Sequence, residues 1–339
     1  MLRLALARSA AAAFFAFSLL APRVGRAFCR TTTLPIPADH GPARGCFTEG
    51  LPLFWRGACI GYSVNRAASA TVPFAEASRV IDEAFAAWNV RCGATSTAVG
   101  ISTQSLGAVT CSEVRYNATE PNQNLIVFRD ESWPHSEPDS TLGLTTVSFN
   151  PDTGEIFDVD MEINASGRNL STAASAPPAA FDLLSIVTHE AGHFLGLAHA
   201  SDAKSTMFAS YPPGTSALRT LEQDDIAGIC EIYPSSTERN VAPGARAAGL
   251  AVATACDATP RHDFATTCDG RAAPSDAVAG LTGCAVPTRH LPPPDAPPWG
   301  PLAMAGGLGA VLCRRRARIT TRGPAMHRAR TTGRSHGRG

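Results

Sequence analysis

The chain has 339 residues, of which 44% are hydrophobic and 17% charged. Because single domains usually run to ~100–200 residues, this length predicts one enzyme-sized domain with a substantial core, plus appendages. The formal net charge is zero, but nine Arg and no acidic residue follow Asp295, so residues 28–295 form an acidic body. An acidic body argues against nucleic acid as the main partner and is compatible with calcium.

The first 27 residues are typical of a secretory signal peptide. Two Arg precede an apolar stretch at 10–20, and small residues stand at Gly25 and Ala27. A membrane anchor is the alternative, but an anchor needs ~20 consecutive apolar residues and this stretch is shorter. We expect cleavage after Ala27 and export to the cell surface or the medium.

The ten cysteines of an exported chain are expected to form disulfides rather than to stay reduced. Local pairing would join Cys92 to Cys111 and Cys256 to Cys268. Four other cysteines precede residue 235, namely Cys29, Cys46, Cys59 and Cys230. They could form two disulfides in any of three pairings.

The first half of the chain alternates strand-like and helix-like patterns. Residues 58–65, "ACIGYSVN", are typical of a strand. A helix is predicted at 73–89, because Pro73 suits a first helical turn and apolar residues follow at helical spacing. Those residues are Phe74, Ala77, Ile81, Phe85 and Trp88. Residues 124–130 and 144–150 are further strand candidates, followed by a turn at 150–155.

Residues 155–164, "EIFDVDMEIN", alternate apolar and polar side chains. A period of two puts the apolar set on one face of a strand and Asp158, Asp160 and Glu162 on the other. One interpretation is a strand with its polar face in solvent. The other is a calcium site, because hard cations need several oxygen ligands and clustered carboxylates repel one another without a cation.

The helical pattern resumes at 178–195 and stops at Gly196. A last helix is expected at 221–233, where Thr220 and Gln223 would form a capping box. No sustained periodicity follows. We interpret residues 236–298 as an Ala/Pro/Gly-rich linker or a small extension held by disulfides.

The stretch "SIVTHEAGHFLGLAHA" carries the residues with metal-binding chemistry. His189 and His193 are four residues apart, so in a helix they project from one face, one turn apart, and can hold one ion. A catalytic zinc takes three protein ligands and leaves its fourth position to water. His199 supplies the third ligand if the chain turns back after the helix, and Gly196 permits that turn at no Cβ cost.

Glu190 stands beside the first of these ligands and is the candidate general base. It would take the proton of zinc-activated water that attacks a peptide carbonyl and pass this proton to the leaving amine. The spacing His-Glu-x-x-His-x-x-Gly-x-x-His is the long zinc signature of metzincin proteases. Met207, eight residues beyond His199, matches the methionine turn of those enzymes.

Together these features resemble the matrixins, the metzincin family of the matrix metalloproteases and their bacterial relatives. The segment "LEQDDIAGICEIYP" at 221–234 is similar to the helix that closes matrixin catalytic domains, and we place that domain at residues 28–235. The resemblance implies an α+β fold of the zincin type, with three helices and a twisted, mainly parallel five-stranded sheet. One antiparallel edge strand, here 144–150, would dock the substrate, and residues 208–220 would form the specificity loop.

The resemblance also implies structural calcium, for which Asp158, Asp160 and Glu162 are the candidates. The histidine-rich loop that a second, structural zinc would need is absent, and only His135 lies upstream near the sheet. Cys92 in "VRCGAT" resembles an inhibitory cysteine superficially, but it follows the first helix inside the domain. We therefore interpret Cys92 as a disulfide partner.

Residues 299–339 join a short apolar, glycine-rich run to an Arg-rich tail. They resemble the Myxo-CTERM class of bacterial sorting tails, in which a cysteine, here Cys284, precedes a hydrophobic segment and a basic stop. This resemblance implies transient membrane anchoring, with the arginines on the cytoplasmic side. A disordered basic tail is the alternative, since the apolar run is short for a span of ~20 residues.

The leading hypothesis is an exported, monomeric zinc endopeptidase that acts on proteins or peptides. The rival is a non-catalytic surface protein on the same scaffold, which holds peptide without cleaving it. A structural zinc normally closes its fourth position with a protein ligand, so the presence of Glu190 beside a three-histidine set favours the enzyme.

Overall fold

The computed structural model describes residues 28–37, 40, 44–236, 238–242, 245–246, 256–268 and 281–282. The chain divides into the units Met1–Trp299 and Gly300–Gly339, and every described residue belongs to the first. The predicted signal peptide and the predicted sorting tail lie outside the described residues, and both stay predictions.

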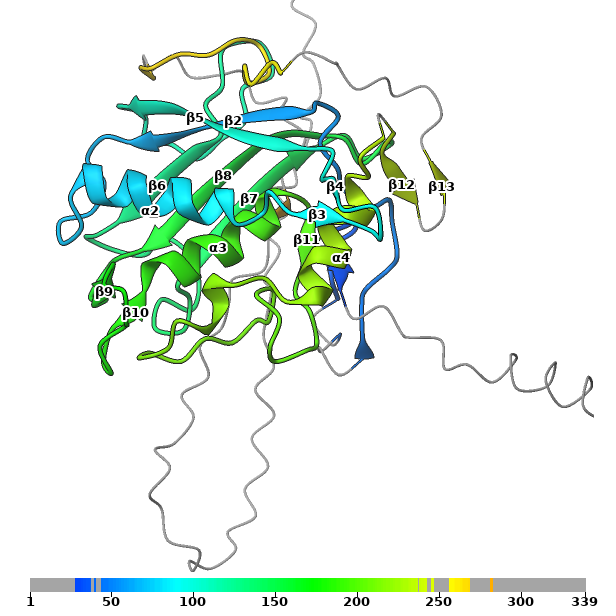
Figure 1. Cartoon of the computed structure of the whole chain (residues 1–339). Helices are drawn as coiled ribbons and strands as arrows, with labels where there is room; N and C mark the ends of the chain where they lie inside the picture. Colours follow the sequence, from blue (N-terminus) through cyan, green and yellow to red (C-terminus); the bar gives the residue numbers. More distant parts are fainter. Residues whose placement is uncertain are drawn as a thin grey trace, which may run out of the picture. The chain divides into compact units, whose positions relative to one another are not determined.

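A mixed sheet of five main strands, with the two-residue strand β14 (Leu281–Thr282) added at one edge, forms the centre of the domain (Figure 1). The five main strands lie in the order β7, β8, β6, β2, β5, and among them only β7 is antiparallel to its neighbour. Their bounds are Gly143–Phe149, Ile156–Asn164, Leu125–Arg129, Cys59–Asn65 and Ser102–Val109, in that order. The predicted fold class is therefore confirmed. β7 is antiparallel as predicted, but it is not the edge of the described sheet, because β14 pairs with its outer side.

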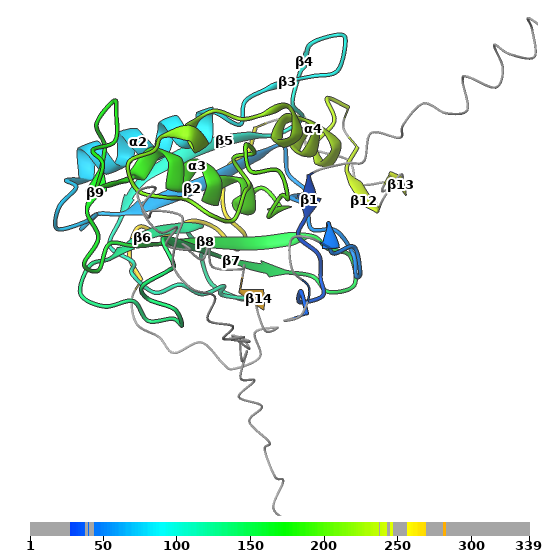
Figure 2. The same cartoon turned by 90° about the horizontal axis from the view of Figure 1, so that it is seen from below.

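The helices α2 (Phe74–Ala86) and α3 (Leu183–Phe194) cover one face of this sheet, with α4 (Gln223–Ile232) at one end (Figures 1 and 2). The Phe85 ring of α2 meets the Phe194 ring of α3 edge to face, with centroids 5.0 Å apart. Burial of such aromatic side chains stabilises the helix layer on the sheet.

The remaining elements are short. The two-residue strands are β1 (Cys29–Arg30), β3 (Arg91–Cys92), β4 (Thr97–Ala98), β9 (Leu170–Ser171), β10 (Phe181–Asp182), β11 (Leu197–Ala198), β13 (Ala245–Arg246) and β14 (Leu281–Thr282). A three-residue strand β12 (Asn240–Ala242) and the 3₁₀ helix η3 (Ala217–Arg219) complete the described elements. β14 pairs with the outer edge of β7.

Strand β8 is buried on both faces, so the expectation of a solvated polar face is wrong. Its apolar side chains Val159, Met161 and Ile163 pack in the main core, and its carboxylates are also shielded from solvent; Asp158, Asp160 and Glu162 are 2%, 4% and 1% exposed. The segment 256–268, yellow in Figure 1, lies on the sheet side away from the helices. It is held there by hydrogen bonds such as that from Asn122 N to Asp263 O, 3.0 Å.

The disulfides join distant parts of the chain. They are Cys29–Cys46, Cys59–Cys256, Cys92–Cys230 and Cys111–Cys268. The predicted local pairs Cys92–Cys111 and Cys256–Cys268 are wrong. Cys92 and Cys111 flank the eight-residue strand β5, and an extended strand rises ~3.3 Å per residue, which keeps its two ends far apart.

Three local predictions also need correction. Helix α3 begins at Leu183 rather than near 178, because the preceding residues form β10, which pairs with β9. The capping box of α4 uses Glu222 and Asp225 rather than Thr220 and Gln223. Strand β5 was not predicted, since "STQSLGAV" is mostly half-exposed and lacks an apolar alternation.

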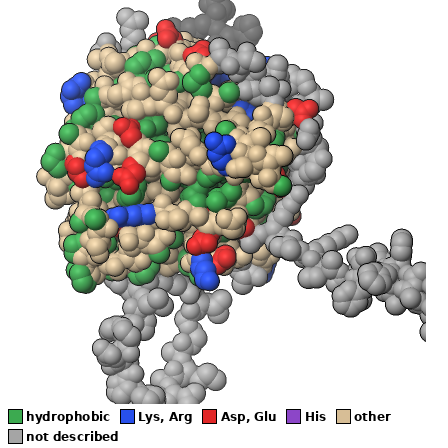
Figure 3. Space-filling view, viewed as in Figure 1, with side chains coloured by type: hydrophobic (Ala, Val, Ile, Leu, Met, Phe, Trp, Pro, Cys, Tyr) green, Lys and Arg blue, Asp and Glu red, His purple; other side chains and the backbone are tan. Residues whose placement is uncertain are grey.

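Charged side chains of both signs are interspersed on the molecular face shown in Figure 3. Among the residues that the structure describes, no helix has the length and apolar content needed to cross a membrane.

Candidate metal centre

His189 and His193 lie one turn apart on α3, and every residue of this helix is buried. Asp182, the residue before the helix, is its N-cap: its side chain accepts a hydrogen bond from Ser185 N at 2.9 Å and so satisfies one of the free backbone N–H groups. The sequence thus forms a short, fully enclosed helix that presents two imidazoles to one point.

The turn after α3 brings His199 to the same point. Gly196 has φ of 95°, and a Cβ there would stand 3.0 Å from the backbone oxygen of Leu53. Only glycine adopts this conformation without strain. The following strand β11 pairs with β1, which fixes the segment that ends in His199.

The three imidazoles form one compact group. Their ring centroids lie 4.7 to 5.2 Å apart, and one ligand nitrogen from each lies within 4.8 Å of the others. Among the described residues, His189, His193 and His199 are the one group of three that could hold a metal ion.

Hydrogen bonds orient the first two rings for metal binding. His189 Nδ1 lies 2.7 Å from Thr206 O, and His193 Nδ1 lies 2.9 Å from Leu197 O. A carbonyl only accepts, so Nδ1 carries the hydrogen in each ring and Nε2 keeps its lone pair, which in His193 lies 3.2 Å from His199 Nε2. The Nε2 of His189 is buried with no hydrogen-bond partner among the described residues. This orphaned nitrogen and the three-nitrogen donor set fit zinc.

Burial keeps the imidazoles neutral. It lowers the pKa of His189 to about 3 and of His193 to about 4, and it lowers the pKa of His199 well below the usual value. A neutral imidazole is the form that binds a metal, so the unprotonated ligands are available throughout the neutral range.

Glu190 follows His189 directly but is not part of the ligand group. Its carboxylate is 1% exposed, and Thr145 Oγ1 of β7 donates a hydrogen bond of 2.7 Å to its Oε2. Burial raises the pKa of Glu190 to about 7, against the opposing effect of the Thr145 hydrogen bond. A carboxyl group with a pKa near neutrality is suited to general base catalysis.

Met207 packs against α3 at Gly192, next to His193. Its predicted place beneath a bound metal stays a prediction. The Met207 side chain is 2% exposed, and its Sδ would stand 2.2 Å from a Cβ at Gly192 of α3. The turn that carries Met207 is held by Asp225 of α4. The Asp225 carboxylate accepts from Ser205 Oγ at 2.5 Å, from Thr206 N at 2.8 Å and from Met207 N at 3.2 Å.

Sequence reasoning missed both Asp225 and Thr145. Asp225 is buried and belongs to the capping box of α4, so an acidic residue in the first helical turn was the available signal. Thr145 gave no signal, because a threonine in a strand is ordinary.

The specificity loop expected at 208–220 is joined to the start of α3. Arg219 donates from Nε to the Asp182 carboxylate at 2.8 Å and makes a second, shorter bond from Nη2. Tyr211 Oη accepts from Asp182 N at 3.2 Å. The loop that would contact a substrate side chain is therefore fixed to the helix that carries the histidines.

The three carboxylates of β8 do not join the histidine group. Glu162 accepts from Arg129 Nε and faces His135 Nε2, both at 2.6 Å. Asp160 accepts from Leu125 N at 2.8 Å, and Oδ1 of Asp158 has no partner among the described residues. Their role as calcium ligands stays a prediction.

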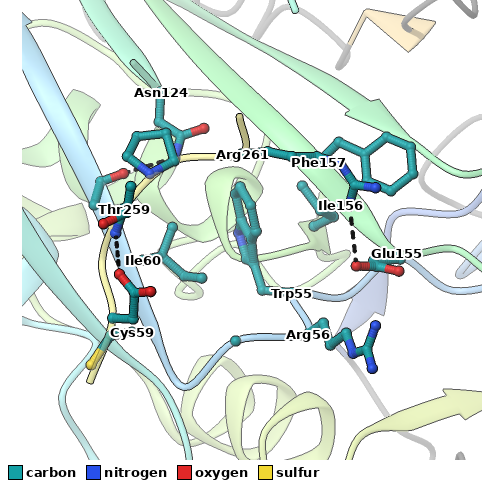
Figure 4. Close-up of a pocket in the computed structure, with 14 residues that line it drawn as sticks. Trp55, Arg56, Cys59, Ile60, Asn124, Glu155, Ile156, Phe157, Thr259 and Arg261 are labelled. Carbon is teal, nitrogen blue, oxygen red and sulfur yellow. Dashed lines mark hydrogen bonds and ion pairs between the residues drawn. The ribbon is translucent and has the colours of Figure 1, made fainter. Parts of the chain in front are cut away.

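A cavity of about 410 Å³ lies beside the segment 256–268, apart from the histidines (Figure 4). Arg261 there pairs with Glu155 at 3.6 Å and stands over the Phe157 ring. Trp55 also lines it and donates from Nε1 to Phe194 O at 2.8 Å, at the end of α3.

Sequence comparisons identify similar proteins. The profile of the matrixin family matches residues 54–234. Metalloendoproteinase 1 of Glycine max is 41% identical over 103 residues, which cover 29% of this chain and 32% of that protein. Neutrophil collagenase of Homo sapiens is 28% identical over 196 residues, 58% of this chain and 36% of that protein. Matrilysin of Homo sapiens is 32% identical over 103 residues, 30% of this chain and 35% of that protein. The matched part of this chain thus spans about a third of the length of these relatives.

Proposed function

The chain belongs to the matrixin family of zinc metalloproteases, and from this premise we propose that it is an exported metalloendopeptidase that hydrolyses peptide bonds in proteins. His189, His193 and His199 would hold the catalytic zinc, and Glu190 would act as the general base. The observation that carries the proposal is the buried Glu190 carboxylate beside three imidazoles whose lone pairs converge.

Zinc, when bound, supplies a Lewis acid that polarises a carbonyl and lowers the pKa of water. The protein side of the reaction follows from the residues present. Thr206 and Leu197 fix the tautomers of His189 and His193. Glu190 takes a proton from the attacking water and later delivers it to the leaving amine, and its buried carboxylate is held for this role by the Thr145 hydroxyl.

Substrate placement is proposed for strand β7 and the loop 208–220. β7 is the antiparallel strand beside β8, and it contacts α3 through Thr145 and Glu190. The two-residue strand β14 pairs with its outer edge at Thr146 and Val147, so a docking peptide would take the place of β14 there. An extended peptide that adds to such an edge gains main-chain hydrogen bonds. The loop, fixed by Arg219 to Asp182, would then select the side chain that follows the scissile bond.

The test is cleavage of an unstructured protein by the full exported chain. We expect cleavage that a chelator abolishes and added zinc restores. The histidine triplet would also bind about one zinc per chain. Absence of zinc-dependent cleavage in a sample that holds its zinc would contradict the proposal and favour the non-catalytic surface protein. A fourth protein ligand found on the zinc would also favour that rival.

Calcium at Asp158, Asp160 and Glu162 is a separate, smaller proposal. The orphaned Oδ1 of Asp158 supports it, as does the pKa of Asp160, which burial raises to about 7. A hard cation would neutralise both groups, whereas Glu162 already has Arg129 and His135 as partners. We expect calcium to raise the melting temperature of the wild type but not of Asp158→Asn. An equal rise in melting temperature for both proteins would contradict the calcium proposal.

The remaining proposals concern location and organisation. From the sequence we propose a signal peptide that is cleaved after residue 27, a domain at 28–235, an extension at 236–298 and an anchoring tail at 299–339. We also propose that the protein is a monomer. The disulfides Cys59–Cys256 and Cys111–Cys268 suit an oxidising compartment and support export. N-terminal sequencing and mass measurement of the protein from the culture medium would test both processing steps.

A further inference from the structure

Two residues of β7, Gly143 and Thr145, lie against the Glu190 carboxylate, and we call this pair the carboxylate seat. Gly143 and Thr145 are two positions apart, so both present the same side of the strand to α3. Their register partners on β8, Ile163 and Met161, belong to the main core under the helices. The seat is therefore built on the sheet rather than on a loop.

Thr145 supplies the polar contact of this seat. Its hydroxyl donates 2.7 Å to Oε2 of Glu190 and lies farther, 3.4 Å, from the Glu190 backbone oxygen. A hydroxyl has one hydrogen, so the shorter contact to the carboxylate is the one that it makes. Thr145 is 1% exposed and β-branched, so its χ1 rotation is restricted.

Gly143 leaves room for the Glu190 carboxylate because it has no Cβ. A Cβ at this position would stand 2.6 Å from Oε1 of Glu190 and 2.8 Å from both Cδ and Cγ. Contacts that short would force the carboxylate to move. The two residues of β7 thus restrain both oxygens of Glu190. The missing side chain at Gly143 leaves room for Oε1, and the Thr145 hydroxyl donates to Oε2.

We propose that Thr145 is a positioning residue for Glu190, and that with Gly143 it fixes the direction in which the carboxylate faces the reacting water. This inference rests on the proposed function, because the direction of the carboxylate matters only if Glu190 moves the proton. A general base misplaced by about 1 Å loses much of its effect. The role of Thr145 is to hold the base, and it touches no reacting atom itself.

Two substitutions of Thr145 test the contribution of its hydroxyl group separately from that of its side-chain shape. Thr145→Val keeps the shape and removes the donor, so kcat should fall ~10- to 100-fold while KM stays within about twofold. Thr145→Ser keeps the donor and should retain kcat within about threefold. If Thr145→Val does not fold, Thr145→Ala against Thr145→Ser makes the same comparison, with the same expected difference.

The matched control is Thr141→Val. Thr141 is also fully buried, but its Oγ1 has no hydrogen-bond partner among the described residues. The same chemical change there should leave kcat unaltered. Gly143→Ala should lower kcat, since the added Cβ displaces the carboxylate that Thr145 holds. All variants should retain wild-type zinc content, which shows that the ligand set is intact.

A second readout needs no catalysis. Urea unfolding of the zinc-free wild type, Thr145→Val, Glu190→Ala and the double variant forms a thermodynamic cycle. We expect the cost of Thr145→Val to disappear once Glu190 is removed. Additive effects, an unchanged kcat in Thr145→Val, or a Ser variant as slow as the Val variant would each overturn the proposal. A wild type without zinc-dependent cleavage would instead overturn the proposed function, while the cycle would still decide whether Thr145 holds Glu190.

Discussion

The Nδ1 atom of His189 lies 2.7 Å from the backbone oxygen of Thr206. This contact joins the zinc helix to the methionine turn, and the backbone nitrogen of Thr206 in turn donates to Asp225 of α4 at 2.8 Å. A single buried carboxylate therefore holds the turn that sets the tautomer and direction of His189, a proposed zinc ligand. Such indirect partners commonly alter metal affinity when they are removed.

Asp225→Ala should weaken zinc binding by ~10- to 100-fold, because the turn loses the acceptor shared by Ser205, Thr206 and Met207. Competition with a chromogenic chelator measures this affinity. Asp202→Ala is the control, because Asp202 is exposed and its carboxylate accepts from Lys204 N at 3.0 Å, away from the turn's backbone donors Thr206 N and Met207 N. Equal affinity in the Asp225 variant and the wild type would show that the turn keeps its shape without this carboxylate.

Arg219→Met should destabilise the fold by ~3–5 kcal/mol, since it leaves the fully buried Asp182 carboxylate without its cation. Arg79→Met is the matched control, because Arg79 pairs with glutamates on the surface at 52% exposure, where solvent screens the pair, and its loss should cost far less. Urea unfolding measures both. Adding Asp182→Asn to the Arg219 variant should recover stability. Similar losses for the two arginine variants would contradict the structural role given to this pair.

Asp160 should give the stability of the zinc-free protein a pH dependence. Burial raises its pKa from 3.8 to about 7 in the folded state. Between these values the folded state binds more protons than the unfolded state, so this contribution to stability is lost as pH rises from about 4 through 7. The fall in unfolding free energy between pH 5 and pH 8 should therefore be smaller in Asp160→Asn. Identical falls in both proteins would argue that Asp160 stays ionised when buried.

The segment 256–268 should stabilise the catalytic domain. Replacing Cys59 and Cys256 together by Ser should lower the unfolding free energy by ~2–5 kcal/mol, because it opens the bond that joins this segment to β2. Denaturant titration under non-reducing conditions measures the change. If the double variant unfolds at the wild-type midpoint, hydrogen bonds such as Asn122 to Asp263 hold the segment without the disulfide.

The histidine centre could be predicted because it depends on local geometry. His189 and His193 share a helix face at any site where that helix forms, and Gly196 marks the turn that returns His199. The alternation in β8 likewise predicted which side chains share a face.

The features that could not be predicted from the sequence depend on contacts between residues that are far apart in the chain. Cys92 meets Cys230, 138 residues away, only after α4 has packed near β3. The acidic face of β8 is buried only because other parts of the chain cover it. Thr145 and Glu190 are 45 residues apart, and their contact requires the sheet and α3 to be assembled first.

Glu190→Ala tests the central claim most directly, provided that zinc content and peptide cleavage are measured on the same sample. The three ligands are untouched by this change, so we expect zinc content equal to that of the wild type. Without the general base, kcat should fall by at least ~100-fold. Full cleavage by the zinc-loaded Glu190→Ala protein would contradict the account.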